Sequence, residues 1–152
     1  MIVAFIGHNR LYSVNELLEE LTQEIKKIIL LNEKTLFYFG GIGDFDNICV
    51  KACLEIKKEW KSCELFLITP YININNKEIL HYDGIIYPPI EKAPLKFAIS
   101  YRNRWMVDKA DVIIAYVDHP FGGAYNTLQY AKRKKKYIIN LANQLNNKKE
   151  NP

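Results

Sequence analysis

Residues 112–124 of the 152-residue chain read VIIAYVDHPFGGA. The first six residues are apolar apart from one tyrosine, which predicts a strand over 112–117 that is buried on both faces. A short loop and the pair Gly122-Gly123 follow, and a helix is predicted from Ala124 to Lys134. A buried strand that leads through a loop into a helix is typical of proteins with a parallel sheet.

The same alternation of strands and helices extends along most of the chain. The other predicted strands cover residues 2–6, 35–39, 65–69, 84–87 and 137–141, and the other predicted helices cover 14–29, 44–60 and 97–109. The first helix is introduced by the capping box Ser13-Val14-Asn15-Glu16. We therefore predict a Rossmann-like α/β fold, a mostly parallel sheet of about six strands with helices on both faces. Residues 1–145 form a single domain in this prediction, and residues 146–152 form a polar, frayed tail.

Composition excludes several classes of protein. The net charge of +4 is mild, which argues against a nucleic-acid partner, and no apolar run approaches the ~20 residues of a membrane span. Residues 1–7 are interpreted as a strand and not as a signal peptide, and the odd number of cysteines argues against disulfides, so the expected compartment is the cytoplasm. Cys49 and Cys53 are four residues apart, but no nearby histidine or cysteine completes a zinc set. We therefore predict neither a metal site nor a cofactor.

Polar and glycine-rich segments follow four of the predicted strands. In open α/β sheets, ligands bind outside the carboxyl ends of the strands, so these segments point to a single crevice. The segments are Gly7-His8-Asn9-Arg10, residues 40–46 (GGIGDFD), Thr69-Pro70-Tyr71, and residues 118–124 (DHPFGGA).

Two of these segments place a glycine pair at the start of a helix. The pairs are Gly40-Gly41, with Gly43 beyond it, and Gly122-Gly123. The free amides of a helix N-terminus attract phosphate, although a tight turn that needs positive φ would also select glycine. Two pairs at one edge of the sheet favour a ligand. Neither segment is a G-x-G-x-x-G or Walker A motif, so a standard dinucleotide fold or an NTPase is not indicated.

Arginine is scarce among the 21 basic residues, yet Arg102 and Arg104 stand in one triplet. The planar guanidinium holds phosphate oxygens in a way that lysine cannot. Residues two apart on a helix do not share a face, so we expect one of the two at the crevice and the other paired with Asp108 or Asp111. Arg10 lies on the same predicted edge.

His8 and His119 lie in two of the edge loops. Each could donate to a phosphate or move a proton, although taken singly each is interpreted as an ordinary loop histidine. The basic run of residues 132–136 is interpreted as a solvated helix end, with a nucleic-acid patch as the alternative.

Several of these stretches, in this order, resemble the SLOG superfamily, which includes the Lonely-guy (LOG) phosphoribohydrolases and the Smf/DprA DNA-processing proteins. They are Gly40-Gly41-x-Gly43, residues 102–108 (RNRWMVD), and Asp111 through Phe121-Gly122-Gly123-Ala124. The chain also resembles a small bacterial and phage subfamily of SLOG proteins in Phe5-Ile6-Gly7-His8, Phe45-Asp46, Tyr87-Pro88 with Glu91 and Pro94, and Phe97-Ala98-Ile99. The resemblance extends to about Leu141.

The resemblance implies a Rossmann-like fold whose glycine motifs hold the phosphate of a nucleotide or a nucleotide derivative. LOG enzymes cleave a ribose–base bond with an arginine of an R-K-x-x-M motif and a glutamate after P-G-G-x-G-T, and Arg102 or Arg104 matches the first element. Where the glutamate is needed, this chain offers Gln129 or Tyr130, and neither is a carboxylate. The LOG-type catalytic glutamate is therefore missing.

Our first hypothesis is a module that binds or senses a nucleotide or an ADP-ribose-like phosphorylated ligand. Tyr71 or Tyr87 would stack on the base or ribose. The candidate ligand-binding residues are Gly7, His8, Arg10, Gly40, Gly41, Gly43, Tyr71, Arg102, Arg104, His119, Gly122, Gly123 and Ala124.

Two alternatives remain open. The chain could be an N-glycosidic enzyme, either a nucleoside-monophosphate phosphoribohydrolase or a deoxyribosyltransferase-like base exchanger. Its candidate catalytic residues are then Glu91, Asp46 and Arg102, with Asp118 as a further possible carboxylate. The chain could also be a DprA-like nucleic-acid-associated module, which the mild charge disfavours. The expected partner is a nucleotide-like small molecule and not a membrane, and the LOG resemblance implies a homodimer.

Overall fold

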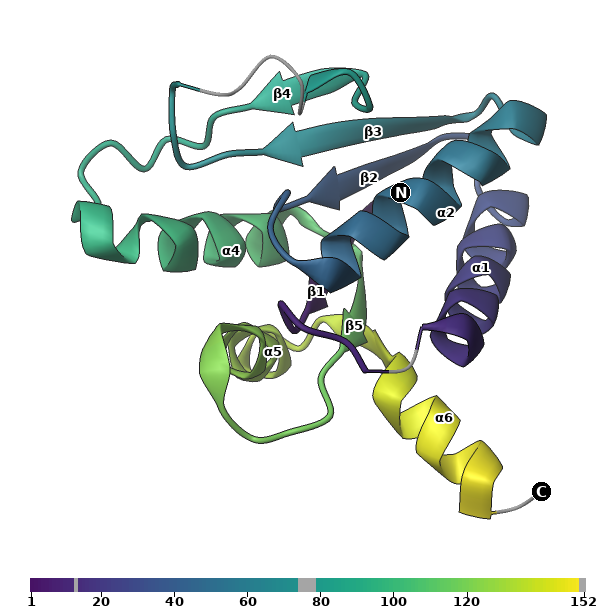
Figure 1. The fold of residues 1–152 in the computed structure, drawn as a ribbon. Coiled ribbons are helices and arrows are strands. Elements are labelled where there is room, and N and C mark those ends of the chain that lie inside the picture. The colour runs from purple at the N-terminus through teal and green to yellow at the C-terminus, as the bar shows by residue number, and fades with distance from the viewer. Residues whose placement is uncertain (13, 74–78, 151–152) are drawn as a thin grey trace.

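The computed structural model describes residues 1–12, 14–73 and 79–150. In these ranges, parallel strands form one six-stranded sheet in the order β4-β3-β2-β1-β5-β6, which confirms the predicted fold class (Figure 1). The strands are β1 (Ile2–Gly7), β2 (Thr35–Phe39), β3 (Cys63–Ile68), β4 (Gly84–Ile86), β5 (Val112–Tyr116) and β6 (Tyr137–Asn140). The helices are α1 (Asn15–Leu30), α2 (Asp44–Glu59), the 3-10 turn η1 (Leu95–Phe97), α4 (Ala98–Lys109), α5 (Gly122–Arg133) and α6 (Leu141–Glu150).

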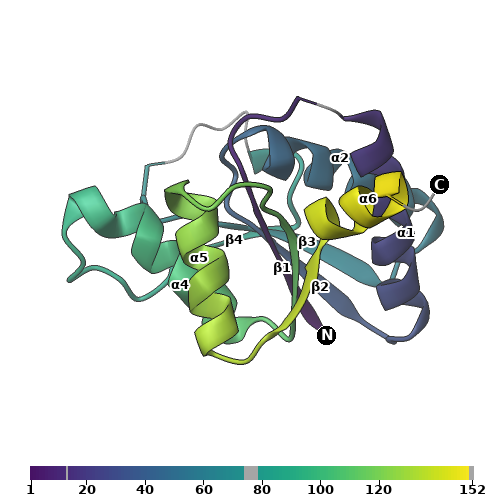
Figure 2. The ribbon, with the colours of Figure 1, turned by 90° about the horizontal axis from the view of Figure 1, so that it is seen from below.

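Helices cover both faces of the sheet, as Figure 2 shows from below. Helices α1, α2 and α6 pack on one face, and α4 and α5 pack on the other. The strands alternate between these two cores: Val3 and Phe5 of β1 face α1 and α2, whereas Ala4 and Ile6 face α4 and α5. This explains why β1 is apolar at every position, since each face of a central strand is covered by helices.

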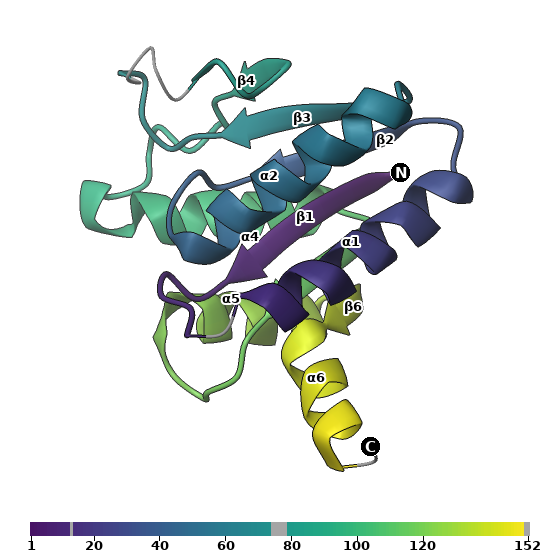
Figure 3. The same ribbon diagram turned by 45° about the vertical axis from the view of Figure 1, so that its right-hand side comes forward.

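The strand order reverses at β1, which pairs with β2 on one side and with β5 on the other. The chain leaves β1 through α1 toward β2, whereas α4 carries it from the outer strand β4 back across the sheet to β5 (Figure 3). The loops that follow β1 and β5 therefore diverge and leave a crevice at their carboxyl ends.

Several predicted boundaries shift in the structure. The predicted third strand begins two residues earlier, at Cys63, and the helix expected from Ala124 begins at Gly122. Residues 146–150, which were predicted as part of a polar tail, continue α6. Leu141 at the start of that helix is fully buried, and Lys148 near its end forms an ion pair with Glu20 of α1.

Ser13, the first residue of the predicted capping box, lies outside the described residues. Within the described ranges, no helix combines the length and the apolar character that crossing a membrane requires.

Candidate functional site

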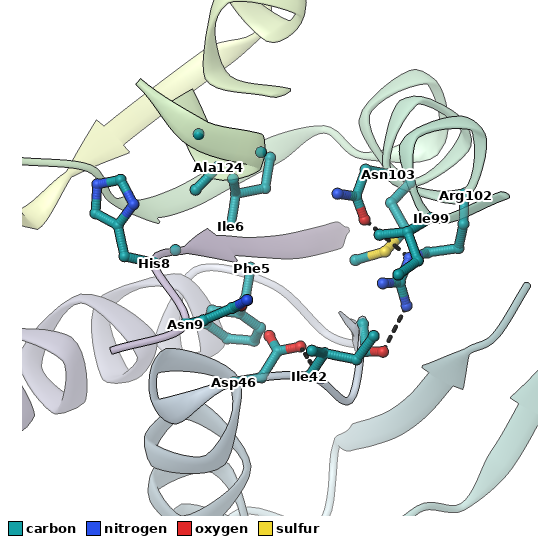
Figure 4. Close-up of a pocket in the computed structure, with 15 residues that line it drawn as sticks. Phe5, Ile6, His8, Asn9, Ile42, Asp46, Ile99, Arg102, Asn103 and Ala124 are labelled. Atoms are coloured by element: carbon teal, nitrogen blue, oxygen red, sulfur yellow. Dashed lines mark hydrogen bonds between the residues drawn. The ribbon is translucent and has the colours of Figure 1, made fainter. Parts of the chain in front are cut away.

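A pocket of about 280 Å³ lies where the strand order reverses, and we call it the switch-point pocket (Figure 4). Its walls come from the carboxyl ends of β1 and β2 and from α2, α4 and α5, which are far apart in the sequence. It is lined by Phe5, Ile6, Gly7, His8, Asn9, Gly40, Ile42, Asp46, Ile99, Arg102, Asn103, Met106, Gly122, Gly123 and Ala124. The four loops were predicted to form one crevice, and the structure brings three of them together here.

Arg102 of α4 is 2% exposed and forms part of the pocket wall. Its Nη1 donates to the carbonyl oxygens of Gly40 and Ile68, the second at 2.6 Å, and its Nε donates to Oδ1 of Asn103 at 2.8 Å. Figure 4 shows the side chain reaching down from α4 to the loop after β2. No residue that the structure describes accepts a hydrogen bond from Nη2, which therefore remains available to a ligand.

Arg104 is exposed and does not line the pocket, so only one arginine of the triplet reaches the crevice, as the helical spacing predicts. The expected pairing of the other arginine with an aspartate is wrong. The guanidinium of Arg104 lies over the rings of Tyr101 and Tyr130, 5.9 and 5.5 Å from their centroids. Asp108 instead accepts from the Tyr130 hydroxyl at 2.9 Å, and Asp111 accepts from the Ile2 amide at 2.7 Å.

Asp46 lies in the first turn of α2, buried under the loop that follows β2. Its Oδ2 accepts from the Ile42 amide at 3.1 Å, which ties this loop to the helix. Burial raises the pKa of Asp46 to about 6, although the loop amides and the charge of Arg102 act in the opposite direction. The pocket therefore holds a carboxyl group that titrates at about pH 6.

Each glycine pair contains one residue with positive φ, Gly41 at 73° and Gly122 at 90°, so the turn itself favours glycine at these two positions. The other glycine of each pair differs in its surroundings. A Cβ at Gly40 would lie 2.9 Å from the guanidinium of Arg102, so a side chain there would displace this buried, hydrogen-bonded group. A Cβ at Gly123 would meet no atom within 4 Å, and φ is not positive at this residue, so the fold itself does not require glycine. In the described part of the chain, no side chain caps α5. Its first amides therefore lie at the pocket wall without partners from a cap, as an anion site requires.

His8 and His119, which were predicted as separate loop histidines, are in contact. Their rings stack with centroids 3.5 Å apart and an interplanar angle of 9°, and Asp118 lies beside both. Burial lowers the pKa of His8, and His119 lowers it further, whereas Asp118 raises it. Sequence reasoning did not pair these residues because His8 and Asp118 are 110 residues apart. Only the pairing of β1 with β5 brings them together.

The remaining candidates lie outside the switch-point pocket. Tyr71 and Gly41 line a second, adjoining hollow of about 730 Å³, which shares Gly40 and Ile42 with the first. Six other candidates line neither hollow: Arg10, Gly43, Tyr87, Glu91, Asp118 and His119.

The cysteines behave as small core residues. Cys49 and Cys53 are buried free thiols on the inner face of α2, and burial raises the pKa of each well above its usual value. This agrees with the interpretation of the two cysteines as apolar residues on a helix face.

No family model and no curated protein matches this chain. Several solved structures are similar to it, including the following three. DNA processing protein A (DprA) from Helicobacter pylori, described for its single-stranded DNA binding mode, superposes with a TM-score of 0.63 at 17% identity over 91% of this chain and 63% of that one. DprA from Streptococcus pneumoniae superposes with a TM-score of 0.63 at 16% identity over 90% of this chain and 48% of that one. The protein TM1055 superposes with a TM-score of 0.60 at 15% identity over 91% of this chain and 72% of that one.

This chain thus spans less than two thirds of the length of each DprA chain. At these identities, the likeness establishes the arrangement of helices and strands. The chain has the Rossmann-like α/β fold that these three proteins share with it.

Proposed function

We propose that this chain is a SLOG-type module that binds a nucleotide or an ADP-ribose-like ligand in the switch-point pocket. One observation carries the proposal: the uncapped, glycine-rich start of α5 and the buried guanidinium of Arg102 line the same pocket. A phosphate in this pocket would accept from the first amides of α5 and from Nη2 of Arg102. The SLOG-like motifs and the fold shared with the DprA structures support this assignment.

The adjoining hollow supports a ligand larger than a phosphate. It meets the switch-point pocket at Gly40 and Ile42 and is lined by Tyr71, whose side chain is partly exposed. A base held there would stack on an aromatic ring, as bases commonly do in proteins. Tyr87 lines neither hollow, so Tyr71 is the better candidate of the two tyrosines.

Gly123→Asp is expected to weaken ligand binding strongly without destabilising the fold. An aspartate in the first turn interacts favourably with the helix dipole, so the melting temperature should stay level or rise. The same carboxylate would lie where we place the phosphate, and we expect the affinity to fall by about 100-fold. Calorimetry with a panel of nucleoside monophosphates, ADP-ribose and cyclic nucleotides first identifies the ligand, and the variant is then titrated with it.

Asn126→Asp is the matched control, because it adds the same charge to an exposed position one turn further along α5. This variant should bind with an affinity close to that of the unmodified chain. Absence of heat and of thermal stabilisation with every member of the panel would refute the proposed function.

A second candidate function, cleavage of the ribose–base bond of a nucleoside monophosphate, is favoured by Asp46. Its carboxyl lies in the switch-point pocket with a pKa of about 6, which suits a general acid at neutral pH. Glu91 is exposed and lines neither hollow. If the chain is such an enzyme, Asp46→Asn should reduce base release by at least about 100-fold, and Glu91→Gln should leave it unchanged. Base release measured by chromatography tests this, and equal losses in the two variants would contradict the role of Asp46.

A further inference from the structure

His8, Asp118 and His119 form a compact cluster at the carboxyl ends of β1 and β5. Oδ1 of Asp118 lies 3.3 Å from Nε2 of His8 and 2.6 Å from Nδ1 of His119. One nitrogen or oxygen atom from each of the three residues lies within 4.8 Å of the other two. Across residues 1–12, 14–73 and 79–150, no other set of three histidine, cysteine or acidic side chains meets this condition.

The hydrogen bonds identify the atom that each residue of the cluster would offer to an ion. Nε2 of His8 accepts from the backbone amide of Asp118 at 3.3 Å, so this nitrogen carries the lone pair, and an ion bound to it would replace that hydrogen bond. The 2.6 Å contact between His119 and Asp118 is that of a nitrogen and an oxygen sharing a proton. A cation that replaces this proton would find two imidazole nitrogens and one carboxylate oxygen around it.

The distance between His8 and Asp118 suits a small tetrahedral ion, whereas the 2.6 Å between Asp118 and His119 must lengthen. Zinc binds histidine nitrogen and carboxylate oxygen at about 2.0–2.2 Å, so two of its ligand atoms lie roughly 3.4 Å apart. The separation of His8 and Asp118 already has this value to within 0.1 Å. The ring of His119, which stacks between those of His8 and Phe121, must turn to direct its nitrogen to the same point.

The three side chains of the cluster differ in their exposure to solvent. The side chain of His8 is 8% exposed and is held at the end of the central strand, whereas those of Asp118 and His119 are 40% and 36% exposed. The buried ligand gives a fixed point, and the two accessible ligands can close on an ion that arrives from solvent.

We propose that His8, Asp118 and His119 bind a divalent transition-metal ion, with Zn²⁺ as the ion best matched to this ligand set. Two histidines and one carboxylate are the protein ligands of many zinc sites that keep a fourth position for water or substrate. The sequence, in which only the two cysteines of α2 were weighed as metal ligands, predicts no metal site. The proposal does not depend on the proposed function, because it concerns the metal alone.

The test is calorimetric titration of the full chain, without a histidine tag, with Zn²⁺ in a non-chelating buffer at pH 7.5. One ion per chain is expected, and Zn²⁺ at about 100 times its Kd should raise the melting temperature by roughly 5–10 °C. His119→Ala and Asp118→Ala should each weaken binding by at least about tenfold. Both residues are partly exposed, so the variants should fold. Titration with Co²⁺ provides the spectrum of a four-coordinate site with nitrogen and oxygen ligands.

His81→Ala is the matched control, since His81 is an exposed histidine of the second hollow, outside the cluster. This variant should keep the full Zn²⁺ affinity, and Mg²⁺, which prefers oxygen ligands, should not bind to the unmodified chain. The proposal is overturned if no one-to-one binding is seen. It is equally overturned if binding survives in His119→Ala, or if His81→Ala weakens it as much as the cluster variants do.

Discussion

Arg102→Met is expected to destabilise the protein by about 3–5 kcal/mol, because it removes the donor on which two backbone carbonyl groups depend. The guanidinium is 2% exposed and donates to the carbonyl oxygens of Gly40 and Ile68. Methionine fills much of the space but donates to neither, so two carbonyl groups lose a partner at about 1–3 kcal/mol each. Asp46 also loses the positive charge that lowers its pKa. Urea unfolding should show a lower midpoint with an unchanged slope.

Arg104→Met is the matched control, because it makes the same change two residues along the same helix at an exposed site. The loss of contacts with the Tyr101 and Tyr130 rings should cost no more than about 1 kcal/mol. Equal effects of the two substitutions would show that Arg102 does not hold the loop after β2 in place.

Asp46 is expected to make the stability of the protein fall as the pH rises from about 4 to about 6. Its pKa is raised from 3.8 to about 6 in the folded chain, so over this interval the folded state keeps a proton that the unfolded state loses. The free energy of unfolding then decreases with pH at up to 1.4 kcal/mol per pH unit, which amounts to about 3 kcal/mol. Above pH 6, both states have lost the proton and the contribution stays constant.

Asp46→Asn removes this titration while keeping an oxygen that can accept from the Ile42 amide. The stability of the variant relative to the unmodified chain should therefore rise by about 3 kcal/mol between pH 4 and pH 7. Chemical unfolding at a series of pH values measures this difference. Asp44→Asn, at an exposed position of the same helix, leaves Asp46 in place and should keep the slope. A stability difference for Asp46→Asn that does not change with pH would contradict the buried, protonated state.

Most of the fold was predictable because the hydrophobic pattern of each strand and helix is visible in its own segment of the sequence. Buried strands such as Val3–Ile6 are apolar at every position, and the 3.6-residue spacing of α1 and α2 places their apolar residues on one face. Helix α6 was missed because only its first two residues, Leu141 and Ala142, are fully buried and the rest of its sequence is polar apart from Leu145. The stability of such a segment comes from tertiary contacts, which the sequence pattern does not contain.

The candidate site was predictable only in part. Helical spacing indicates that one of Arg102 and Arg104 faces the crevice, but it does not say which of them. Gly40 looks like an anion-binding glycine in the sequence, whereas in the structure the absent side chain makes room for Arg102. Contacts of this kind join distant segments, so no local pattern carries them.

The pairing of β1 with β5 has a kinetic consequence. Strands β1, β2 and β3 each pair with the next strand along the chain. Ile6, in contrast, pairs with Ala115, and forming that contact closes a loop of more than a hundred residues. Contacts of such long range form late, because the entropy of loop closure is lost before they stabilise the chain. The switch-point pocket requires this contact, since its walls come from both sides of it. A ligand bound in the pocket would contact both sides of the pairing between β1 and β5, and it would therefore slow the separation of these two strands.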